Sequence, residues 1–299
     1  MKFSKFKALD YKTDDDFESF WENNKYTKDI FEKSRLYAQN FKSFNDVDEC
    51  VYRVDASISE SLIYKVYDAK QKFVICCFSS GDIIGTNEEA LMWAHYADSS
   101  KGIRIDFTID KKFQGFVKEV EYGRRELFNN NEELKEELDE NKLENIICRK
   151  DEVWKYEKEY RAIFPGNNTV SGTGNVNSTF VPIDIKEITF GRGCGFSHDD
   201  NPNDGKTVEN AGSHILKIAS FIYEILKKNN SNMPKFYRYK DKYSSERVEI
   251  EIEENSLKVE IINKLESKRD SLQNEIGKLK NEIGKLKKEI ANMNKKGKK

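Results

Sequence analysis

The sequence predicts one mixed α/β globular domain followed by a C-terminal parallel coiled-coil helix. Phe73–Phe78 is a continuous apolar run of β-forming residues, which is typical of a strand buried on both faces. Ile103–Phe107 alternates apolar and polar residues, as a strand with one buried face does. From Ile262 onward, apolar residues recur three and four positions apart, the spacing of a coiled coil. We therefore expect a domain over residues 1–255 and an oligomerisation helix with a basic tail over residues 256–299.

The other elements of the domain follow from local patterns. Phe17, Phe20 and Trp21 recur at helical spacing behind the carboxylates of residues 14–16, which predicts a helix there. Thr86 is a predicted N-cap for a helix over residues 88–97. Two further helices are predicted, over residues 131–148 and 215–226. Strands are predicted over residues 35–38, 117–122, 161–164, 181–190 and 248–252.

The C-terminal heptad places mostly Ile at the a positions and mostly Leu at d, which favours two parallel strands. A tandem repeat, residues 274–280 and 281–287, places Glu at g and Lys at the following e, a pair that attracts across a parallel seam. The predicted partner is residues 262–293 of a second copy, or a like helix on another protein. The alternative is a single solvated helix, because Gly277 and Gly284 each cost about 1 kcal/mol against Ala.

Composition restricts the class of protein. The five cysteines lack metal-site spacing and are odd in number, so neither a disulfide framework nor a structural metal is expected. No apolar run resembles a signal peptide or a membrane span, which predicts a cytoplasmic protein without a membrane partner. The formal net charge of -2 argues against binding nucleic acid through bulk charge. Nucleic acid could still be a substrate through a local basic patch.

Three segments carry residues with both a chemical and a structural interpretation. Asn45 lies in a turn whose polar side chains bond their own backbone. Ser79 and Ser80 end the predicted buried strand, where hydroxyls either cap the next turn or hold a ribose or phosphate. His95 and Tyr96 lie on a predicted helix beside Trp, where a lone His is commonly a hydrogen-bonded core residue.

A fourth segment carries two carboxylates, Glu157 and Glu159, just before or within a predicted strand. A period of two would place both on one face. Adjacent carboxylates repel, so one of them tends to a raised pKa and can act as an acid or base. Arg161 follows on the same face and could bind a carboxylate or phosphate bidentately. The alternative is an exposed edge strand whose carboxylates pair with Lys155 and Lys158.

Taken together, the motifs resemble one family. Phe-Asn-Asp, Cys-Phe-Ser, Met-Trp-Ala-His-Tyr-Ala with Lys-Gly-Ile-Arg-Ile-Asp-Phe, and Trp-Lys-Tyr-Glu-Lys-Glu-Tyr-Arg occur in this order. The sequence from about Phe3 to Ile252 is similar to the uncharacterised bacterial family called domain of unknown function 2971. The resemblance implies no activity, but it suggests a bacterial antiviral defence or toxin-type setting. It also favours a functional role for Asn45, His95, Tyr96, Glu159 and Arg161.

A second resemblance concerns mechanism. ADP-ribosyltransferases use a basic residue or His on the first strand, serines at a strand end, and a Glu-x-Glu pair on a later strand. Phe78-Ser-Ser80 and Glu157-Lys-Glu159 occur here in that order, whereas the first strand offers Lys5 and Lys7. The resemblance implies an enzyme that uses NAD. Its catalytic residues would be Glu159, Glu157, His95, Tyr96 and Arg161, and its NAD-binding residues Ser79, Ser80, Asn45 and Lys5.

In that reading, Glu159 would bond the nicotinamide ribose and stabilise an oxocarbenium-like transition state. Glu157 would orient or deprotonate the acceptor, and Ser79 would support the ribose. Two alternatives remain open. A metal-dependent nuclease or hydrolase could use His95 with the carboxylates of Asp46, Asp48, Asp106 and Glu159. A non-catalytic sensor or scaffold would instead be oligomerised by the coiled coil.

Overall fold

The computed structural model describes residues 1–10, 17–44, 50–123, 127–138, 140–165, 178–194, 205–229, 231–241 and 244–252, with three single positions, Ile276, Leu279 and Ile283. The chain divides into two compact units, Met1–Ile250 and Glu251–Lys299. Among the described helices, none has the length and apolar character that a membrane span requires.

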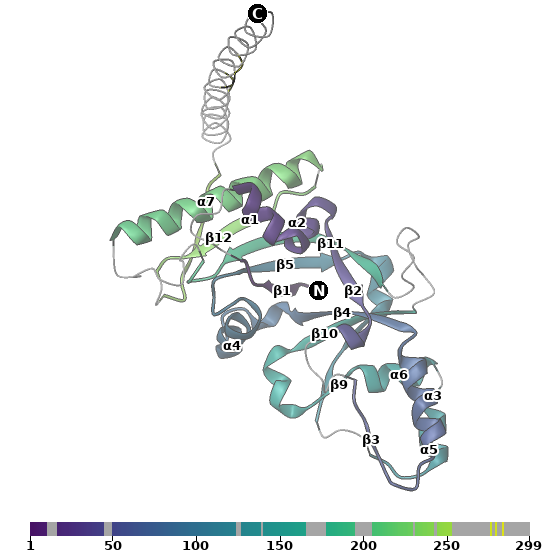
Figure 1. Ribbon diagram of the computed structural model, residues 1–299. Coiled ribbons are helices and arrows are strands. Elements are labelled where there is room, and N and C mark those ends of the chain that lie inside the picture. The colour runs from purple at the N-terminus through teal and green to yellow at the C-terminus, as the bar shows by residue number, and fades with distance from the viewer. Residues whose placement is uncertain are drawn as a thin grey trace, which may run out of the picture. The chain divides into compact units, whose positions relative to one another are not determined.

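The first unit is built on a mixed sheet of nine described strands (Figure 1). Their order is β13-β12-β11-β5-β1-β4-β10-β6, and β2 pairs outside this path with β11 and β4. The strands are β1 (Phe3–Lys7), β2 (Arg35–Gln39), β4 (Phe73–Ser80), β5 (Ile103–Ile109), β6 (Val117–Glu119), β10 (Glu159–Pro165), β11 (Ser178–Phe190), β12 (Lys235–Tyr239) and β13 (Arg247–Glu249).

The predicted buried strand is confirmed as β4. Val74 and Ile75 are each 1% exposed, and β4 pairs antiparallel with β10 from Phe73–Pro165 to Ser79–Glu159. The pairings also close a ring through β1, β5, β11, β2 and β4. The ring closes at a single pair, Gln39 with Ile75, so β4 is covered along both edges.

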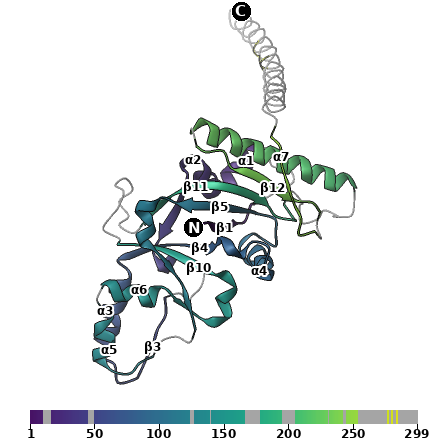
Figure 2. The same cartoon turned by 180° about the vertical axis from the view of Figure 1, so that it is seen from behind.

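Helices lie at both ends of the strand order (Figures 1 and 2). α1 (Phe17–Asn23), α2 (Lys25–Lys33) and α7 (Gly205–Lys228) lie near β11 and β12. α4 (Asn87–Tyr96) lies beside β1 and β4, and α3 (Glu60–Lys70), α5 (Asn131–Glu136) and α6 (Glu140–Ile147) lie beyond β10. The predicted mixed α/β domain is therefore confirmed.

Four 3₁₀ helices and two small parallel pairs complete the first unit in its described part. The 3₁₀ helices are η1 (Phe41–Ser43), η2 (Gly81–Ile83), η3 (Lys111–Phe116) and η4 (Glu152–Glu157). The pairs are β3 (Arg53–Val54) with β8 (Leu127–Phe128), and β7 (Glu121–Tyr122) with β9 (Arg149–Lys150).

Two predicted elements are divided in the structure. The helix predicted over 131–148 is two helices, α5 and α6. Leu134 and Leu143 are nine positions apart, so one straight helix would place them on opposite faces, yet both are buried in one cluster. The strand predicted over 117–122 is β6 and β7, because the chain changes partner from β10 to β9 at Val120.

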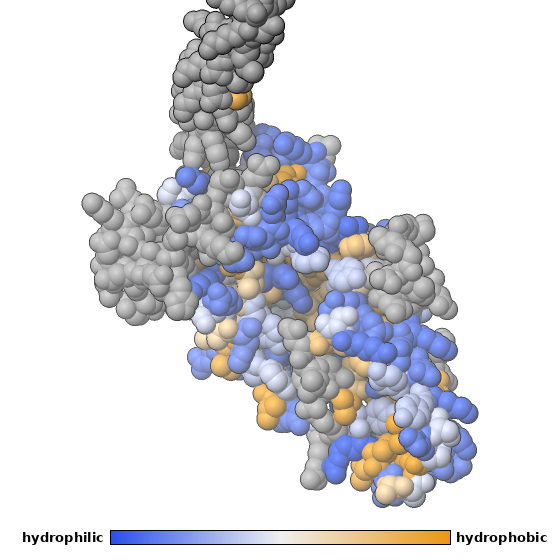
Figure 3. Space-filling model, viewed as in Figure 1, coloured by the Kyte–Doolittle hydropathy of each residue, from blue (hydrophilic) through white to orange (hydrophobic). Residues whose placement is uncertain are grey.

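The expectation that Glu157 lies in strand register with Glu159 is wrong. Glu157 ends η4, and Lys158 then takes a left-handed conformation with φ 43° before β10 begins. Figure 3 shows a mostly hydrophilic surface on the face in view, with a hydrophobic patch near the end where α3 and α5 lie.

Little of the predicted coiled coil falls on described residues. Ile276, Leu279 and Ile283 are helical and 51%, 53% and 51% exposed. The other heptad positions over 262–293 lie outside the described residues, so the coiled coil stays a prediction.

Candidate functional site

Polar side chains cross the sheet in one line. Glu187 pairs with Asp106, Asp106 with Ser4, Ser4 with Ser79, and Ser79 with Glu159, on the five neighbouring strands β11, β5, β1, β4 and β10. Directly paired residues of antiparallel strands project to the same face. We call these five residues the polar row, and the face that carries them the α4 face. Four of the five are buried, Glu187 being the exception.

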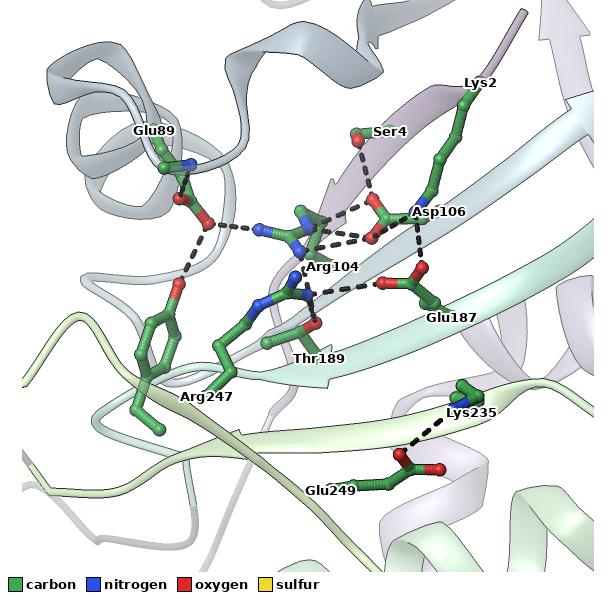
Figure 4. Close-up of polar contacts among 12 residues, drawn as sticks. Lys2, Ser4, Glu89, Arg104, Asp106, Glu187, Thr189, Lys235, Arg247 and Glu249 are labelled. Carbon is green, nitrogen blue, oxygen red and sulfur yellow. Dashed lines mark hydrogen bonds and ion pairs between the residues drawn. The ribbon is translucent and has the colours of Figure 1, made fainter.

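A first charged cluster surrounds Arg104 on β5, near the β11 end of the polar row (Figure 4). The Arg104 guanidinium is fully buried and donates to both oxygens of Asp106, at 3.0–3.2 Å. It also donates to Glu89 on α4 and to Thr189 Oγ1 on β11, the latter at 3.3 Å. Ser4 donates to Asp106 at 2.6 Å. A buried Arg is thus matched by two carboxylates, as a charge in a low-dielectric interior requires.

The first cluster is partly exposed to solvent at Glu187, whose contacts Figure 4 shows. Glu187 accepts from Lys2 at 2.6 Å and from Arg247 at 3.4 Å, and all three side chains are partly exposed. On the α4 side, Glu89 also accepts from Tyr239 and Trp93, at 2.9 and 3.2 Å. Burial would raise the pKa of Glu89, but the charge of Arg104 and these hydrogen bonds hold it below its usual value. Glu89 is therefore an ionised anchor.

A second charged cluster surrounds Glu159 at the β10 end. Arg161 donates to both oxygens of Glu159, at 2.8 and 3.2 Å, and Lys150 on β9 adds a third contact at 3.1 Å. The backbone N–H of Glu159 donates to the Tyr122 hydroxyl at 2.7 Å. Burial opposes ionisation, but the charges of Arg161 and Lys150 hold the pKa of Glu159 far below its usual range. Glu159 is a fixed anion.

Glu157 belongs to the same cluster, but its pKa is shifted in the opposite direction from that of Glu159. Lys150 donates to one oxygen at 2.7 Å, and the Tyr96 hydroxyl donates to the other at 2.5 Å. Burial and the neighbouring Glu159 raise the pKa of Glu157, although Lys150 and Tyr96 oppose the rise. Tyr96 is 41% exposed, so its contact carries the cluster to the protein surface. Glu157 is the carboxylate of this cluster suited to exchange a proton.

Helix α4 joins the two clusters. Its first turn supplies Glu89 to Arg104, and its last residue, Tyr96, bonds Glu157. Between them, Trp93 packs edge-on against Phe6 of β1, with ring centroids 5.1 Å apart. The helix therefore covers the α4 face through contacts at both ends and the middle.

Thiols surround the second cluster. The Cys77 thiol donates a hydrogen bond to Glu159, and Cys50 Sγ lies 3.7 Å from an Arg161 nitrogen. Burial raises the pKa of Cys148 to about 12, so this thiol stays protonated. Its inertness fits a structural role.

Four aromatic rings lie at the surface end of the second cluster. His95 stacks on Tyr156 with ring centroids 5.9 Å apart and planes 29° apart. Trp154 lies 5.9 Å from Tyr156 and 6.4 Å from His95, and Tyr96 lies 6.5 Å from His95. Behind Trp154, the Lys150 ammonium lies 5.1 Å from its ring centroid. We call these four residues the aromatic cluster.

The residues predicted to form one site fall into three groups. Glu157, Glu159, Arg161 and Tyr96 lie in the second cluster, His95 lies beside it, and Ser79 lies directly opposite Glu159. Lys5 and Ser80 each lie one residue from members of the polar row, so they point to the other face. Lys5 donates to the Cys77 carbonyl, and Ser80 accepts from the Asp82 N–H. Asn45 lies outside the described residues.

The metal-dependent alternative gains no support from the described residues. Asp106 and Glu159 are separated by β1 and β4, or roughly 14 Å at ~4.8 Å per strand, and each is bound by an arginine. Within the described ranges, no group of three or more His, Cys, Asp or Glu is arranged to hold a metal ion. Asp46 and Asp48 lie outside those ranges.

Sequence reasoning missed Lys150 and the Arg104 cluster, apart from Asp106, which it named only as a possible metal ligand. The sequence could have indicated the Arg104 cluster, because Arg104 and Asp106 are two positions apart on a predicted strand. Glu159 and Arg161 have the same spacing. Opposite charges at that spacing share one face, so burial of the strand requires them to pair. Lys150 gave no local signal, since it reaches the site through the pairing of β9 with β7.

Comparison with known proteins adds one match. A family model described as "Protein of unknown function (DUF2971)" matches residues 92–162. This supports the family resemblance over a narrower stretch than Phe3–Ile252. The matched stretch includes the aromatic cluster, most of the second charged cluster, and Arg104 and Asp106 of the first. No curated protein and no solved structure matches the chain.

Proposed function

We propose that the protein is an NAD-dependent transferase of the ADP-ribosyltransferase type, with its site where α4, η4 and β10 meet. One observation carries the proposal. The first strand, the strand that ends in serines and the strand that follows Glu-x-Glu are neighbours, in the order β1-β4-β10, and Ser79 lies directly opposite Glu159. Ser79 and Glu159, which the resemblance requires together, are thus adjacent although 80 positions separate them, whereas Lys5 and Ser80 point to the other face.

The contacts favour the role that the sequence implied for Glu157, and they favour a changed role for Glu159. Glu159 has both oxygens bound by Arg161 and Lys150, so it acts as an anchor that fixes Lys150 and orients the cluster. Glu157 lies nearer the surface through Tyr96, and its pKa is raised by burial and by Glu159. We therefore assign the proton-accepting role to Glu157 and a positioning role to Glu159.

The proposed reaction transfers the ADP-ribose group of NAD⁺ to an acceptor O–H or N–H. The bond between C1′ of the nicotinamide ribose and the nicotinamide nitrogen breaks, and its electron pair leaves with neutral nicotinamide. An acceptor O–H or N–H attacks C1′, and its proton passes to the Glu157 carboxylate. The ionised Glu157 and the fixed charge of Glu159 stabilise the positive charge that develops on the ribose. Ser79 pairs directly with Glu159 across β4 and β10, and its hydroxyl would support the ribose.

The direct test is release of nicotinamide from NAD⁺ by the full-length protein, followed by chromatography. We expect release by the wild type and a loss of at least about 100-fold in Glu157→Gln, the usual size of an acid–base contribution. Glu152→Gln is the matched control, because Glu152 lies on the same 3₁₀ helix but pairs with Lys155 at the surface. Equal rates in Glu157→Gln and the wild type would contradict the assignment.

A non-catalytic scaffold is the second candidate, and a specific observation favours it. Every oxygen of Glu157 and Glu159 already has a protein partner, as in a buried network that specifies a fold. In the second unit, Ile276, Leu279 and Ile283 expose an apolar stripe suited to assembly. A folded wild type that releases no nicotinamide yet self-associates would support this candidate over the transferase.

A further inference from the structure

Exposed aromatic side chains gather at one surface of a strongly charged domain. The aromatic cluster comes from two elements only, the end of α4 (His95, Tyr96) and η4 (Trp154, Tyr156). His95 and Tyr96 are exposed, and Trp154 and Tyr156 are half-buried. Rings left at the surface lose the free energy of burial, so a group of four is unexpected unless something covers it.

The backbone beneath the cluster is fixed, which suits a preformed binding surface. η4 begins with a side-chain cap, Asp151 accepting from the Val153 N–H at 3.2 Å, and ends at the left-handed Lys158. α4 is held at its last turn by the Tyr96–Glu157 hydrogen bond. The rings therefore need little ordering when a ligand binds, which lowers the entropic cost of binding.

Ring geometry distinguishes between two kinds of ligand. A cage for an alkylammonium cation needs ring faces around one point, but His95 and Tyr156 are nearly parallel. One approach to Trp154 is also already taken by the Lys150 ammonium. His95 is instead the exposed ring of a nearly parallel pair. A further flat ring can therefore stack on His95.

Charge near the cluster agrees with a ligand that also carries phosphate. Lys155 and Lys158 belong to the same segment as Trp154 and Tyr156, and the largely exposed Lys155 side chain pairs at 2.9 Å with Glu152, which a phosphate would have to replace. Burial and the charge of Glu157 raise the pKa of Tyr156, which keeps its hydroxyl protonated as a donor. A flat ring, a donor at its edge and ammonium groups beside it match a nucleotide.

We propose that the aromatic cluster binds a nucleobase by stacking on His95, which itself stacks on Tyr156, with Lys155 and Lys158 facing the attached phosphate. The base comes from a free nucleotide or from a single nucleic-acid strand, and both sources share this chemistry. The inference names a binding subsite of the site proposed above and does not depend on the transfer reaction.

The test measures binding to the full-length protein by calorimetry with three probes: AMP, ribose 5-phosphate and a short single strand of deoxyadenylates. We expect AMP or the strand to bind, and ribose 5-phosphate, which lacks the base, to bind at least about 10-fold more weakly. Binding of AMP identifies a free nucleotide as the source, whereas binding of the strand alone identifies nucleic acid.

Variants locate the binding. His95→Leu and Tyr156→Leu should each weaken binding about 10-fold or more, and Tyr156→Phe, which keeps the ring but loses the hydroxyl donor, should weaken it less than Tyr156→Leu. Tyr26→Leu is the matched control, because Tyr26 is a 75% exposed aromatic on α2. Unchanged binding in both Leu variants overturns the proposal, as does a folded wild type that binds no base-bearing probe. Binding without nicotinamide release contradicts only the transfer reaction.

Discussion

At the scale of residues, one device appears twice on the α4 face. An arginine and a carboxylate stand two positions apart on one strand, Arg104 with Asp106 on β5 and Glu159 with Arg161 on β10. Each pair shares a face because side chains alternate along a strand. Each arginine is fully buried. Removal of Asp106 or Arg161 would leave a buried charge with one remaining partner, Glu89 for Arg104 and Lys150 for Glu159. Glu157 combines a raised pKa with a hydrogen bond to the partly exposed Tyr96.

Lys7 gives a prediction at this scale. Burial, with a contribution from Lys5, lowers its pKa from 10.5 to about 8. Below about pH 8 the side chain is charged in both the folded and the unfolded protein, so burial of the charge costs free energy there. Between about pH 8 and 10.5 the folded protein loses that proton first, and the cost falls. Lys7→Met should therefore raise Tm at pH 7 by at least about 2 °C.

The pH dependence of the gain checks this explanation. The rise in Tm should shrink when thermal unfolding is repeated near pH 10, since Lys7 is then mostly neutral in the folded state. Lys72→Met serves as the control, because Lys72 is exposed and its loss should not stabilise. A Tm gain that is the same at both pH values would contradict the account of Lys7.

At the scale of elements, most strands of the main sheet were predictable, with β12 as an exception, and their partners were not. β4 and β5 follow from local patterns, because apolar and alternating runs need no knowledge of the rest of the chain. The division into α5 and α6 follows instead from the shared burial of Leu134 and Leu143, which is a tertiary effect. The sequence predicted that strand alternation would place Glu157 beside Glu159. Glu157 does lie in the same cluster, but the 3₁₀ helix η4 and the left-handed Lys158 place it there.

Gly102 gives a prediction about how two elements meet. A Cβ at this position would lie 2.0 Å from the Lys7 carbonyl oxygen, at the point where β1 pairs with β5. Gly102→Ala should destabilise the domain by about 1–3 kcal/mol or more, because backbone must move. Gly115→Ala is the control, since a Cβ there meets nothing within 4 Å, and urea unfolding should give nearly wild-type stability. Similar stability of the two variants would show that the β1–β5 contact adjusts freely.

At the scale of the whole molecule, the heptad implies an assembly. Burial of each Leu or Ile of the seam contributes about 1.5–3 kcal/mol, whereas the exposed Glu–Lys pairs contribute about 0.2–1 kcal/mol each and mainly select orientation. The heptad pattern and the exposure of Ile276, Leu279 and Ile283 support the predicted coiled coil. An assembly would present several copies of the candidate site together.

Light scattering tests self-association. The double variant Ile276→Asp, Ile283→Asp should be monomeric while the circular dichroism of the first unit stays unchanged. Asn281→Asp adds one carboxylate at an f position, away from the seam, and should remain assembled. A wild type that is monomeric at micromolar concentration rules out self-pairing, and the heptad would then belong to a complex with another protein.

The pH dependence of nicotinamide release, measured side by side in the wild type and Tyr96→Phe, tests the central claim most directly. If Glu157 accepts the proton, the rate rises with pH as this carboxyl group ionises, with a midpoint above the usual 4.5, because burial and Glu159 raise its pKa. The Tyr96 hydrogen bond lowers that pKa, so its loss should move the midpoint to higher pH. The same midpoint in both proteins, or no release by the folded wild type, would contradict the account.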